Sequence, residues 1–276
     1  MSSSRCIHQA CRYIHKNLFP QPTKLGSAIA SMLKFFLTLL PLLASFQHSS
    51  QTVGIYKIED PSGESVVGME LSVTKPEGSD IVYKTDASGI ANVTFVNTGI
   101  SELFILEGKL PPLYQTLYIF GILPLEAESF QYTTFIGTRS EARIIAQIID
   151  LPYNKSNAYV VVGIDVLEDR SKGLQPSNLK PAVGASAFME GDIHYGDPFI
   201  FNPRIQQPGN TIEKHGSSWI TFPDVEPGEA EILVTPPAEN QCGISPAFLS
   251  TLGQSIKIDT YPDSITIVSF VCTGGA

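Results

Sequence analysis

Several residue types on which catalysis and metal binding depend are scarce in this chain of 276 residues. It contains five histidines, four cysteines and one tryptophan. It also lacks a Gly-x-Ser-x-Gly nucleophile elbow, a His-Glu-x-x-His zinc motif, a P-loop and a Gly-x-Gly-x-x-Gly nucleotide motif. Catalysis usually needs an acid or base with a supporting partner group. The sequence therefore predicts a non-enzymatic protein without a cofactor or a bound metal.

Basic residues are also few, and acidic residues are absent from the first 50 positions. Those positions hold five of the 18 basic residues, so residues 51–276 carry 13 basic and 27 acidic side chains, a net charge of −14. A surface this acidic repels a phosphate backbone, which excludes nucleic acid as a partner. The apolar content of 43%, with 15 Phe and 10 Tyr, is too high for a disordered chain and suffices for a packed core.

A short apolar block near the N-terminus is flanked by charge on one side and small residues on the other. Lys34 precedes the block at residues 35–43, and Ala44 and Ser45 follow it. This pattern is typical of a secretory signal peptide, and the block is shorter than the about 20 apolar residues that cross a membrane. We expect residues 1–50 to be a cleaved leader, and the mature protein to be secreted or otherwise extracytoplasmic, in the periplasm or at the cell surface, without a membrane span. The alternatives are an uncleaved anchor or a buried core helix.

Cysteine usage agrees with export. Loss of the leader leaves Cys242 and Cys272 as the remaining thiols. In an oxidising compartment an even pair most simply forms a disulfide. Closure of a loop of about 30 residues would stabilise the fold by roughly 3 to 4 kcal/mol. The alternative is two free, buried cysteines.

Many short apolar segments between turn residues indicate an all-β protein. The 22 Gly and 20 Pro disfavour long helices. We expect strands at residues 53–58, 66–74, 81–85, 90–95, 158–166, 182–189, 198–201, 218–222, 230–234 and 264–271. Residues 138–149 suit a helix or a strand. A polar stretch at 151–157 divides the strands into two predicted domains, residues 51–152 and 153–276.

The two halves share sequence patterns that indicate a degenerate repeat. Val66-Val-Gly-Met-Glu-Leu-Ser matches Ala182-Val-Gly-Ala-Ser-Ala-Phe, and Asn92-Val-Thr-Phe matches Trp219-Ile-Thr-Phe. The first half also contains Thr85-Asp-Ala-Ser-Gly, and the second contains Phe222-Pro-Asp-Val-Glu-Pro-Gly. These motifs resemble the carboxypeptidase regulatory-like, or transthyretin-like, family, a relative of collagen-adhesin B-type repeats. The resemblance covers most of residues 51–276.

This resemblance implies two tandem Ig-like or transthyretin-like β-sandwich domains and a role that is mostly non-catalytic. The second half departs from the pattern because it lacks the Asp-Gly turn, and the first half lacks the Pro of the Pro-Gly turn. Physically, we expect Gly68 and Gly184 to permit close backbone approach. In the turn from Asp86 to Gly89 we expect the aspartate side chain to form hydrogen bonds with its own backbone. Phe95 and Phe222 should point into the cores.

One cluster of side chains could carry chemistry. Strand alternation puts Asp192 and His194 on one face, with Asp197 nearby, where they could bind a metal or act as a base and its orienter. The alternative is an exposed acidic tip on a mobile loop, which the neighbouring Gly191 and Gly196 favour.

Trp219 is the other candidate binding residue. Trp219 and Ile220 are consecutive residues of a predicted strand and point to opposite faces of it. Trp219 could therefore be exposed and stack on a sugar or a protein partner. We favour burial of Trp219 against the neighbouring domain. The predicted function is an exported binding or surface-structural module with a protein or cell-surface glycan as partner. The alternatives are a carbohydrate-binding module and a divergent metal-dependent enzyme.

Overall fold

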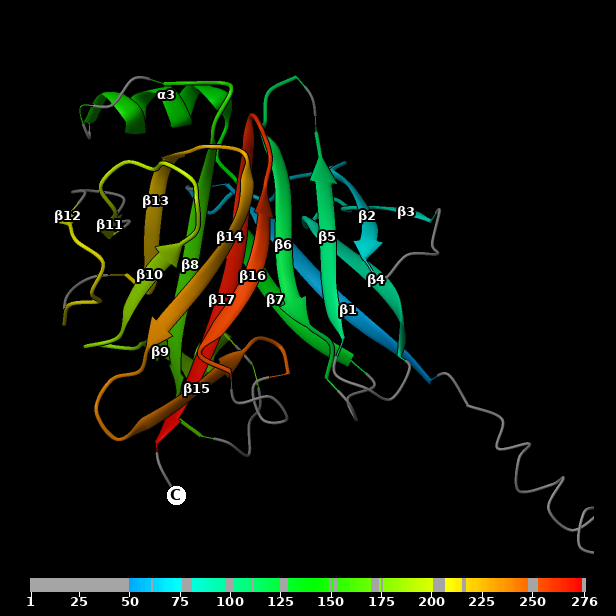
Figure 1. The fold of residues 1–276 in the computed structure, drawn as a ribbon. Helices are drawn as coiled ribbons and strands as arrows, with labels where there is room; N and C mark the ends of the chain where they lie inside the picture. Colours follow the sequence, from blue (N-terminus) through cyan, green and yellow to red (C-terminus); the bar gives the residue numbers. More distant parts are fainter. Residues whose placement is uncertain are drawn as a thin grey trace, which may run out of the picture. The chain divides into compact units, whose positions relative to one another are not determined.

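The computed structural model describes residues 50–60, 62–75, 81–97, 102–110, 112–124, 129–148, 150, 153–169, 174, 176–200, 207–214, 217–247 and 253–274. The predicted leader, with its apolar block at 35–43, lies outside the described residues. Residues Ser49 to Ala276 form one compact unit. Within the described ranges the regular structure is β-strand apart from the helix α3 and the 3-10 turn η2, which confirms the predicted fold class (Figure 1).

The strands follow the predicted pattern of short segments. The first half contains β1 (Ser50–Glu59), β2 (Glu70–Lys75), β3 (Val82–Lys84), β4 (Ile90–Asn97), β5 (Leu103–Lys109), β6 (Thr116–Ile122), β7 (Ser129–Phe135) and α3 (Arg139–Ile148). The second half contains β8 (Ala158–Leu167), η2 (Pro176–Asn178), β9 (Leu179–Pro181), β10 (Ser186–Glu190), β11 (Phe199–Ile200), β12 (Gln207–Pro208), β13 (Trp219–Val225), β14 (Gly228–Thr235), β15 (Asn240–Ile244), β16 (Ser255–Thr260) and β17 (Ser264–Gly274).

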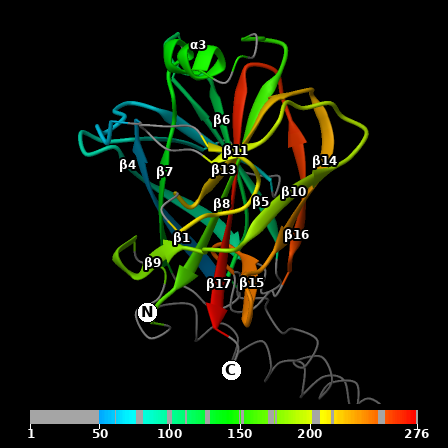
Figure 2. The same ribbon diagram turned by 90° about the vertical axis from the view of Figure 1, so that its left-hand side faces the viewer.

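These strands form one large sheet and two small ones. The large sheet has the order β12-β11-β13-β8-β17-β6-β5-β2-β3, with β15 and β9 pairing to β17 and β8. The small sheets have the orders β4-β1-β7 and β10-β14-β16. Viewed along the edge of the large sheet, the small sheets lie to either side of it (Figure 2).

The strand pairings of the first half recur in the second half. The antiparallel pair β1–β4 and the parallel pair β1–β7 correspond to β8–β13 and β8–β17. The antiparallel pairs β2–β5 and β5–β6 correspond to β10–β14 and β14–β16. Each half is therefore a sandwich of two sheets, as the sequence repeat suggests. The predicted domain boundary at 152–153 falls between α3 and β8.

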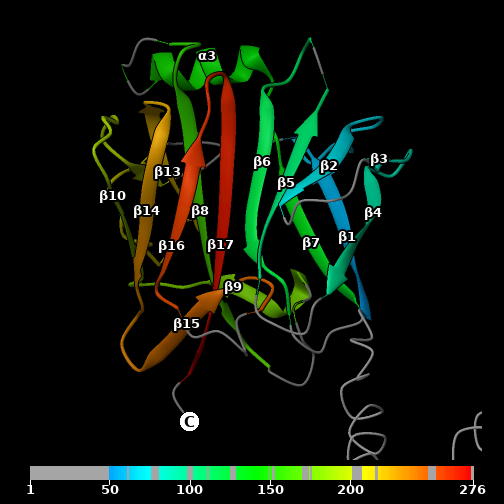
Figure 3. The same ribbon diagram turned by 45° about the vertical axis from the view of Figure 1, so that its right-hand side comes forward.

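The two sandwiches are joined through the parallel pairing of β6 with β17. The register runs from Ser264 opposite Thr116 to Val268 opposite Phe120, and β8 flanks β17 on its other side (Figure 3). Every residue from 264 to 273 is buried. A strand covered on both faces needs a nearly continuous apolar sequence, which explains the run of Ile, Val and Phe in β17.

Neighbouring residues of the shared strands belong to different cores. Ile267 packs into the first core with Tyr56, Phe95 and Leu117, whereas Val268 packs into the second core. Successive side chains of a strand point to opposite faces of a sheet. The two cores therefore lie on opposite faces of the large sheet, each under one small sheet.

Residues 138–149, whose sequence suits either a helix or a strand, contain the helix α3. Thr138 and Glu141 make a reciprocal capping box: the Glu141 N–H donates to Thr138 Oγ1 at 3.1 Å, and the Thr138 N–H donates to Glu141 Oε2 at 2.6 Å. Arg139 holds the helix to the turn before β17 through an ion pair with Asp263 at 2.8 Å. In the described part of the chain, no helix combines the length and apolarity that crossing a membrane requires.

The repeated glycines have a different role from the predicted one. A Cβ added at Gly68 would meet no atom within 4 Å, and one at Gly184 would approach only Pro237, at 3.9 Å. Close backbone approach is therefore wrong as an explanation. Both glycines instead have positive φ, 78° and 89°, which glycine adopts without steric cost.

The predictions for the Asp86 turn and for the two core phenylalanines are confirmed. Asp86 Oδ1 accepts hydrogen bonds from the backbone N–H groups of Ser88 and Ile90 at 2.8 and 3.0 Å. Phe95 and Phe222 are buried, with exposed fractions of 2% and 1%.

Substitution of one β17 side chain should test the shared strand. Ile267→Ala removes three carbon atoms from a fully buried site and should lower the free energy of unfolding by about 2 to 5 kcal/mol. Ile144→Ala, at an exposed position of α3, is the matched control and should change it by less than about 0.5 kcal/mol. Denaturant unfolding of both variants measures the difference. Equal effects of the two substitutions would contradict this packing.

Candidate functional site

Asp192, His194 and Asp197 lie in the segment between β10 and β11, and all three side chains are exposed. Backbone hydrogen bonds fix this segment to β13 and to the connection that follows it: the Gly196 N–H donates to the carbonyl of Pro223 in β13 at 2.8 Å, and the Glu226 N–H donates to the His194 carbonyl at 2.9 Å. The segment is therefore anchored, in contrast to the expected mobile loop.

Neither metal binding nor base chemistry gains support from these three side chains. Among the described residues there is no group of three or more His, Cys, Asp or Glu that could hold a metal ion. The neighbouring Tyr195 has a structural role, because its ring packs edge-on against Phe222 with centroids 5.5 Å apart and its hydroxyl donates to the Met189 carbonyl. A binding role for Asp192, His194 and Asp197 stays a prediction.

Trp219 lies at the start of β13 and is partly buried. Its ring packs edge-on against Phe135 of β7, with centroids 5.3 Å apart at 87°. The ring also covers Gly163 of β8, where an added Cβ would lie 2.6 Å from the Trp219 Cζ3 atom. Because Phe135 belongs to the first half, the contact agrees with burial against the neighbouring domain.

Trp219 also lines a cavity of about 210 Å³ that the sequence did not reveal. The polar side chains of this cavity come from β7, β8 and β17 and from the residues next to β13 and β15, and they include Asp165 of β8 and Tyr132 of β7. The Ser218 hydroxyl donates to Asp165 Oδ1 at 2.5 Å, and the Tyr132 hydroxyl and Ser269 Oγ share a hydrogen bond of 2.6 Å. The sequence does contain one indication of this cavity, because Asp165 is the only charged residue in the apolar run 158–167.

Burial changes the acidity of two groups in this cavity. It raises the pKa of Asp165 to about 6, and the Ser218 hydrogen bond opposes part of that rise. Burial also raises the pKa of Tyr132, and the negative charge of Asp165 adds to the rise. Both groups line the cavity, and both are shifted toward their protonated forms.

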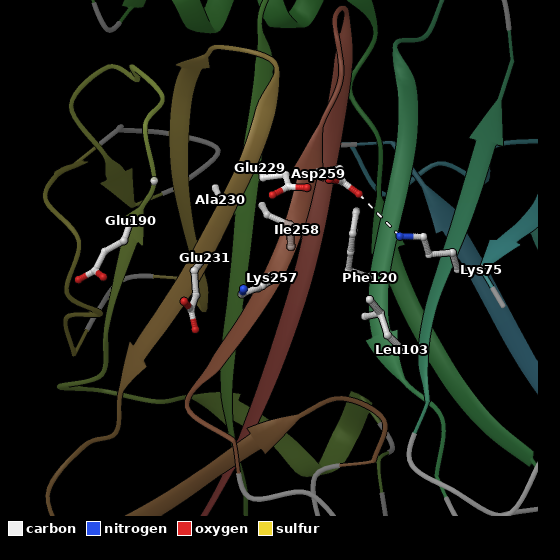
Figure 4. A pocket seen from close by; sticks show the side chains of 11 residues that line it. Lys75, Leu103, Phe120, Glu190, Glu229, Ala230, Glu231, Lys257, Ile258 and Asp259 are labelled. Carbon is white, nitrogen blue, oxygen red and sulfur yellow. Dashed lines mark ion pairs between the residues drawn. The ribbon is translucent and has the colours of Figure 1, made fainter.

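A larger groove of about 490 Å³ lies on the opposite face of the large sheet, beside β16. Leu103, Phe120 and Ile258 form its apolar floor. Figure 4 shows Leu103 and Phe120 between β16 and the strands β5 and β6, with Lys75 and Asp259 joined across them at 4.0 Å. Among the described strands β16 is the last of its sheet, so one side of its backbone faces the groove.

Carboxylates dominate the rim of this groove. Glu229 and Asp259 are directly opposite each other on β14 and β16, and Glu190 and Glu231 are directly opposite on β10 and β14. Like charges in directly opposite positions destabilise a sheet. Lys257, opposite Glu231, offsets part of this repulsion. The rim therefore favours a partner that carries positive charge.

The predicted disulfide between Cys242 and Cys272 is confirmed. The two residues are directly opposite on β15 and β17, 30 positions apart in the sequence. Both are buried in the second core. The bond therefore attaches β15 to the strand that both cores share.

No protein-family model matches the chain, and no curated protein matches it. Among solved structures, the minor pilin GBS52 of Streptococcus agalactiae aligns at 9% identity over 83% of this chain and 97% of that chain, with a TM-score of 0.27. The major pilin of Streptococcus pyogenes aligns at 7% identity over 83% of this chain and 100% of that chain, also with a TM-score of 0.27. The structural neighbours thus include Gram-positive pilins, and similarity at this level does not assign the chain to their family.

The raised pKa of Asp165 predicts how stability depends on pH. An unfolded Asp ionises near pH 3.9 and the folded one near pH 6, so the native state keeps a proton that the unfolded chain has released. The stability due to neutral Asp165 is complete below about pH 4 and is lost as the pH rises to about 6. Asp165→Asn cannot ionise and still offers an acceptor to Ser218. It should exceed the parent in stability at pH 7 by on the order of 1 to 3 kcal/mol.

Urea unfolding at pH 4 and pH 7 measures this difference. The gain of Asp165→Asn over the parent should be present at pH 7 and absent at pH 4. Glu64→Gln, which removes an exposed carboxylate, is the control for the change in net charge. A gain or loss of the same size at both pH values would show that ionisation of Asp165 is not responsible.

Proposed function

We propose that this protein is an exported, non-enzymatic structural module that binds an extracytoplasmic protein partner. The observation that carries the proposal is the buried Cys242–Cys272 disulfide on the strand shared by both cores. Disulfides form and persist in oxidising compartments and are rare in the cytosol. The predicted leader at residues 1–50 supplies the route to such a compartment.

The fold supports a structural role. Two sandwiches joined edge to edge, with every residue of 264–273 buried between them, give a body with little freedom for the halves to move separately. We further propose membership of the carboxypeptidase regulatory-like, or transthyretin-like, family. The Asp86 turn, the paired positive-φ glycines and the repeated strand pairings support this assignment.

We place the partner in the groove beside β16. An extended segment could add to the free side of β16 by backbone hydrogen bonds, since edge strands commonly bind peptides in this way. Alternate side chains of such a segment would meet the apolar floor at Leu103 and Phe120, and the others would meet the acidic rim at Glu229 and Asp259. The expected partner segment is therefore extended, with alternating apolar and basic residues.

Export is tested in the source cells with the full-length chain. The mature protein should begin between Ser45 and Val53 and lie outside the cytoplasm. Alkylation before and after reduction, followed by mass spectrometry, should show Cys242 and Cys272 protected until reductant is added. Full-length protein in the cytosol with both thiols alkylated in the native state would contradict export.

The groove is tested with a peptide of alternating Lys and Val, measured by isothermal titration calorimetry. It should bind more tightly than the corresponding Glu–Val peptide, and the combined variant Glu229→Gln, Asp259→Asn should bind it roughly 3- to 10-fold more weakly. Methylation of alternate backbone amides along one edge of the peptide should abolish binding, because those groups would pair with β16. Binding that survives methylation would exclude strand addition.

A further inference from the structure

The cavity beside Trp219 lies where one small sheet ends. β7 is the last described strand of the sheet β4-β1-β7, and its residues 131–133 line the cavity together with residues of β8, β13 and β17. The site is therefore formed by both halves of the chain, an arrangement that ligand sites often use. Asp165 and Trp219 are each partly exposed, so a small molecule can reach the cavity from solvent.

The polar side of the cavity carries a negative charge, that of the Asp165 carboxylate. Above about pH 6 the Asp165 carboxyl is ionised, and Ser218 is its hydrogen-bond donor. Among the described residues that line the cavity there is no Lys, Arg or His. A mostly buried carboxylate is costly unless a positive group pairs with it. A cationic ligand would supply that group.

The rest of the lining matches an ammonium group on an alkyl chain. An ammonium donates three hydrogen bonds, and the acceptors here include the Asp165 carboxylate and the hydroxyl oxygens of Ser218 and Ser269. The indole of Trp219 attracts a cation, and Leu179 and Val271 offer apolar contacts to methylene groups. A volume of about 210 Å³ is below the roughly 300 to 1,000 Å³ of sites for drug-sized ligands, which limits the ligand to a few carbon atoms.

We propose that this cavity binds a primary ammonium group at the end of a short alkyl chain, carried by a free amine or by the side chain of a lysine. The site is separate from the groove beside β16, on the other face of the large sheet, and its ligand is recognised by charge rather than by strand pairing.

Other ligand classes fit the lining less well. An anion would be repelled by Asp165. A hard divalent cation needs several oxygen ligands with more than one carboxylate as a rule, and Asp165 is the only acidic residue among those that line the cavity in the described part of the chain. A neutral sugar would leave the charge of Asp165 uncompensated.

The fluorescence of Trp219 gives a direct test, because it is the only tryptophan in the chain. n-Butylamine and a lysine capped at both ends are titrated into the protein at pH 7.5, with n-butanol and glucose as neutral probes. We expect a saturable change with at least one amine and none with the neutral probes. Saturation by butylamine alone assigns the site to free amines, and tighter binding of the capped lysine assigns it to a lysyl side chain.

Two variants locate the binding. Asp165→Asn should weaken binding of the effective amine at least tenfold, while Glu64→Gln, at an exposed position outside the cavity, should leave it unchanged. Ser218→Ala, which keeps the charge of Asp165, should weaken it by a few fold. An unchanged emission spectrum of each unliganded variant shows that the cavity has kept its form. The proposal is overturned if no amine gives a saturable change, if butanol or glucose binds as tightly, or if Asp165→Asn binds the amine as the parent does.

Discussion

The parallel pairing of β6 with β17 is the interaction on which the rest of the structure depends. Without it the chain would form two sandwiches connected by a linker, each with an exposed sheet edge. With it, one sheet from each half becomes a single wide sheet that contributes to both cores. The pairing also constrains the sequence of β17, because this strand must present apolar side chains to both faces of the sheet. Ile267 and Val268 satisfy this requirement as adjacent residues that belong to different cores.

The wide sheet explains why the candidate sites lie where they do. Each small sheet has three strands among the described residues and covers only part of the face beneath it, so each ends in an edge strand above the large sheet. β16 is this edge strand on one face of the large sheet, and β7 is the edge strand on the opposite face. The acidic groove lies beside β16, and the Asp165 cavity lies beside β7. Both hollows therefore lie beside the edge of a small sheet, on opposite faces of the wide sheet.

Features set by local chemistry could be predicted from the sequence, and features set by distant pairings could not. The Asp86 turn depends on residues within four positions, and the inward side chains of Phe95 and Phe222 follow from strand alternation. The disulfide was predictable because residues 51–276 contain only two cysteines, Cys242 and Cys272. The β6–β17 pairing joins residues about 150 positions apart, and no local pattern encodes it. Asp165 was missed for the same reason, since the other residues that line its cavity come from β7, β13 and β17 among others. Gly68 was assigned a packing role, although its positive φ is what requires glycine.

The disulfide at the end of β17 has a mechanical consequence. β6 and β8 run parallel to β17, so a pull along this strand must shear many hydrogen bonds together instead of opening them one at a time. Cys272 is bonded to β15, and tension that enters the chain from beyond Gly274 is therefore divided between two strands. The covalent cross-link lies at the point where such a load would first reach the strand that holds both cores together.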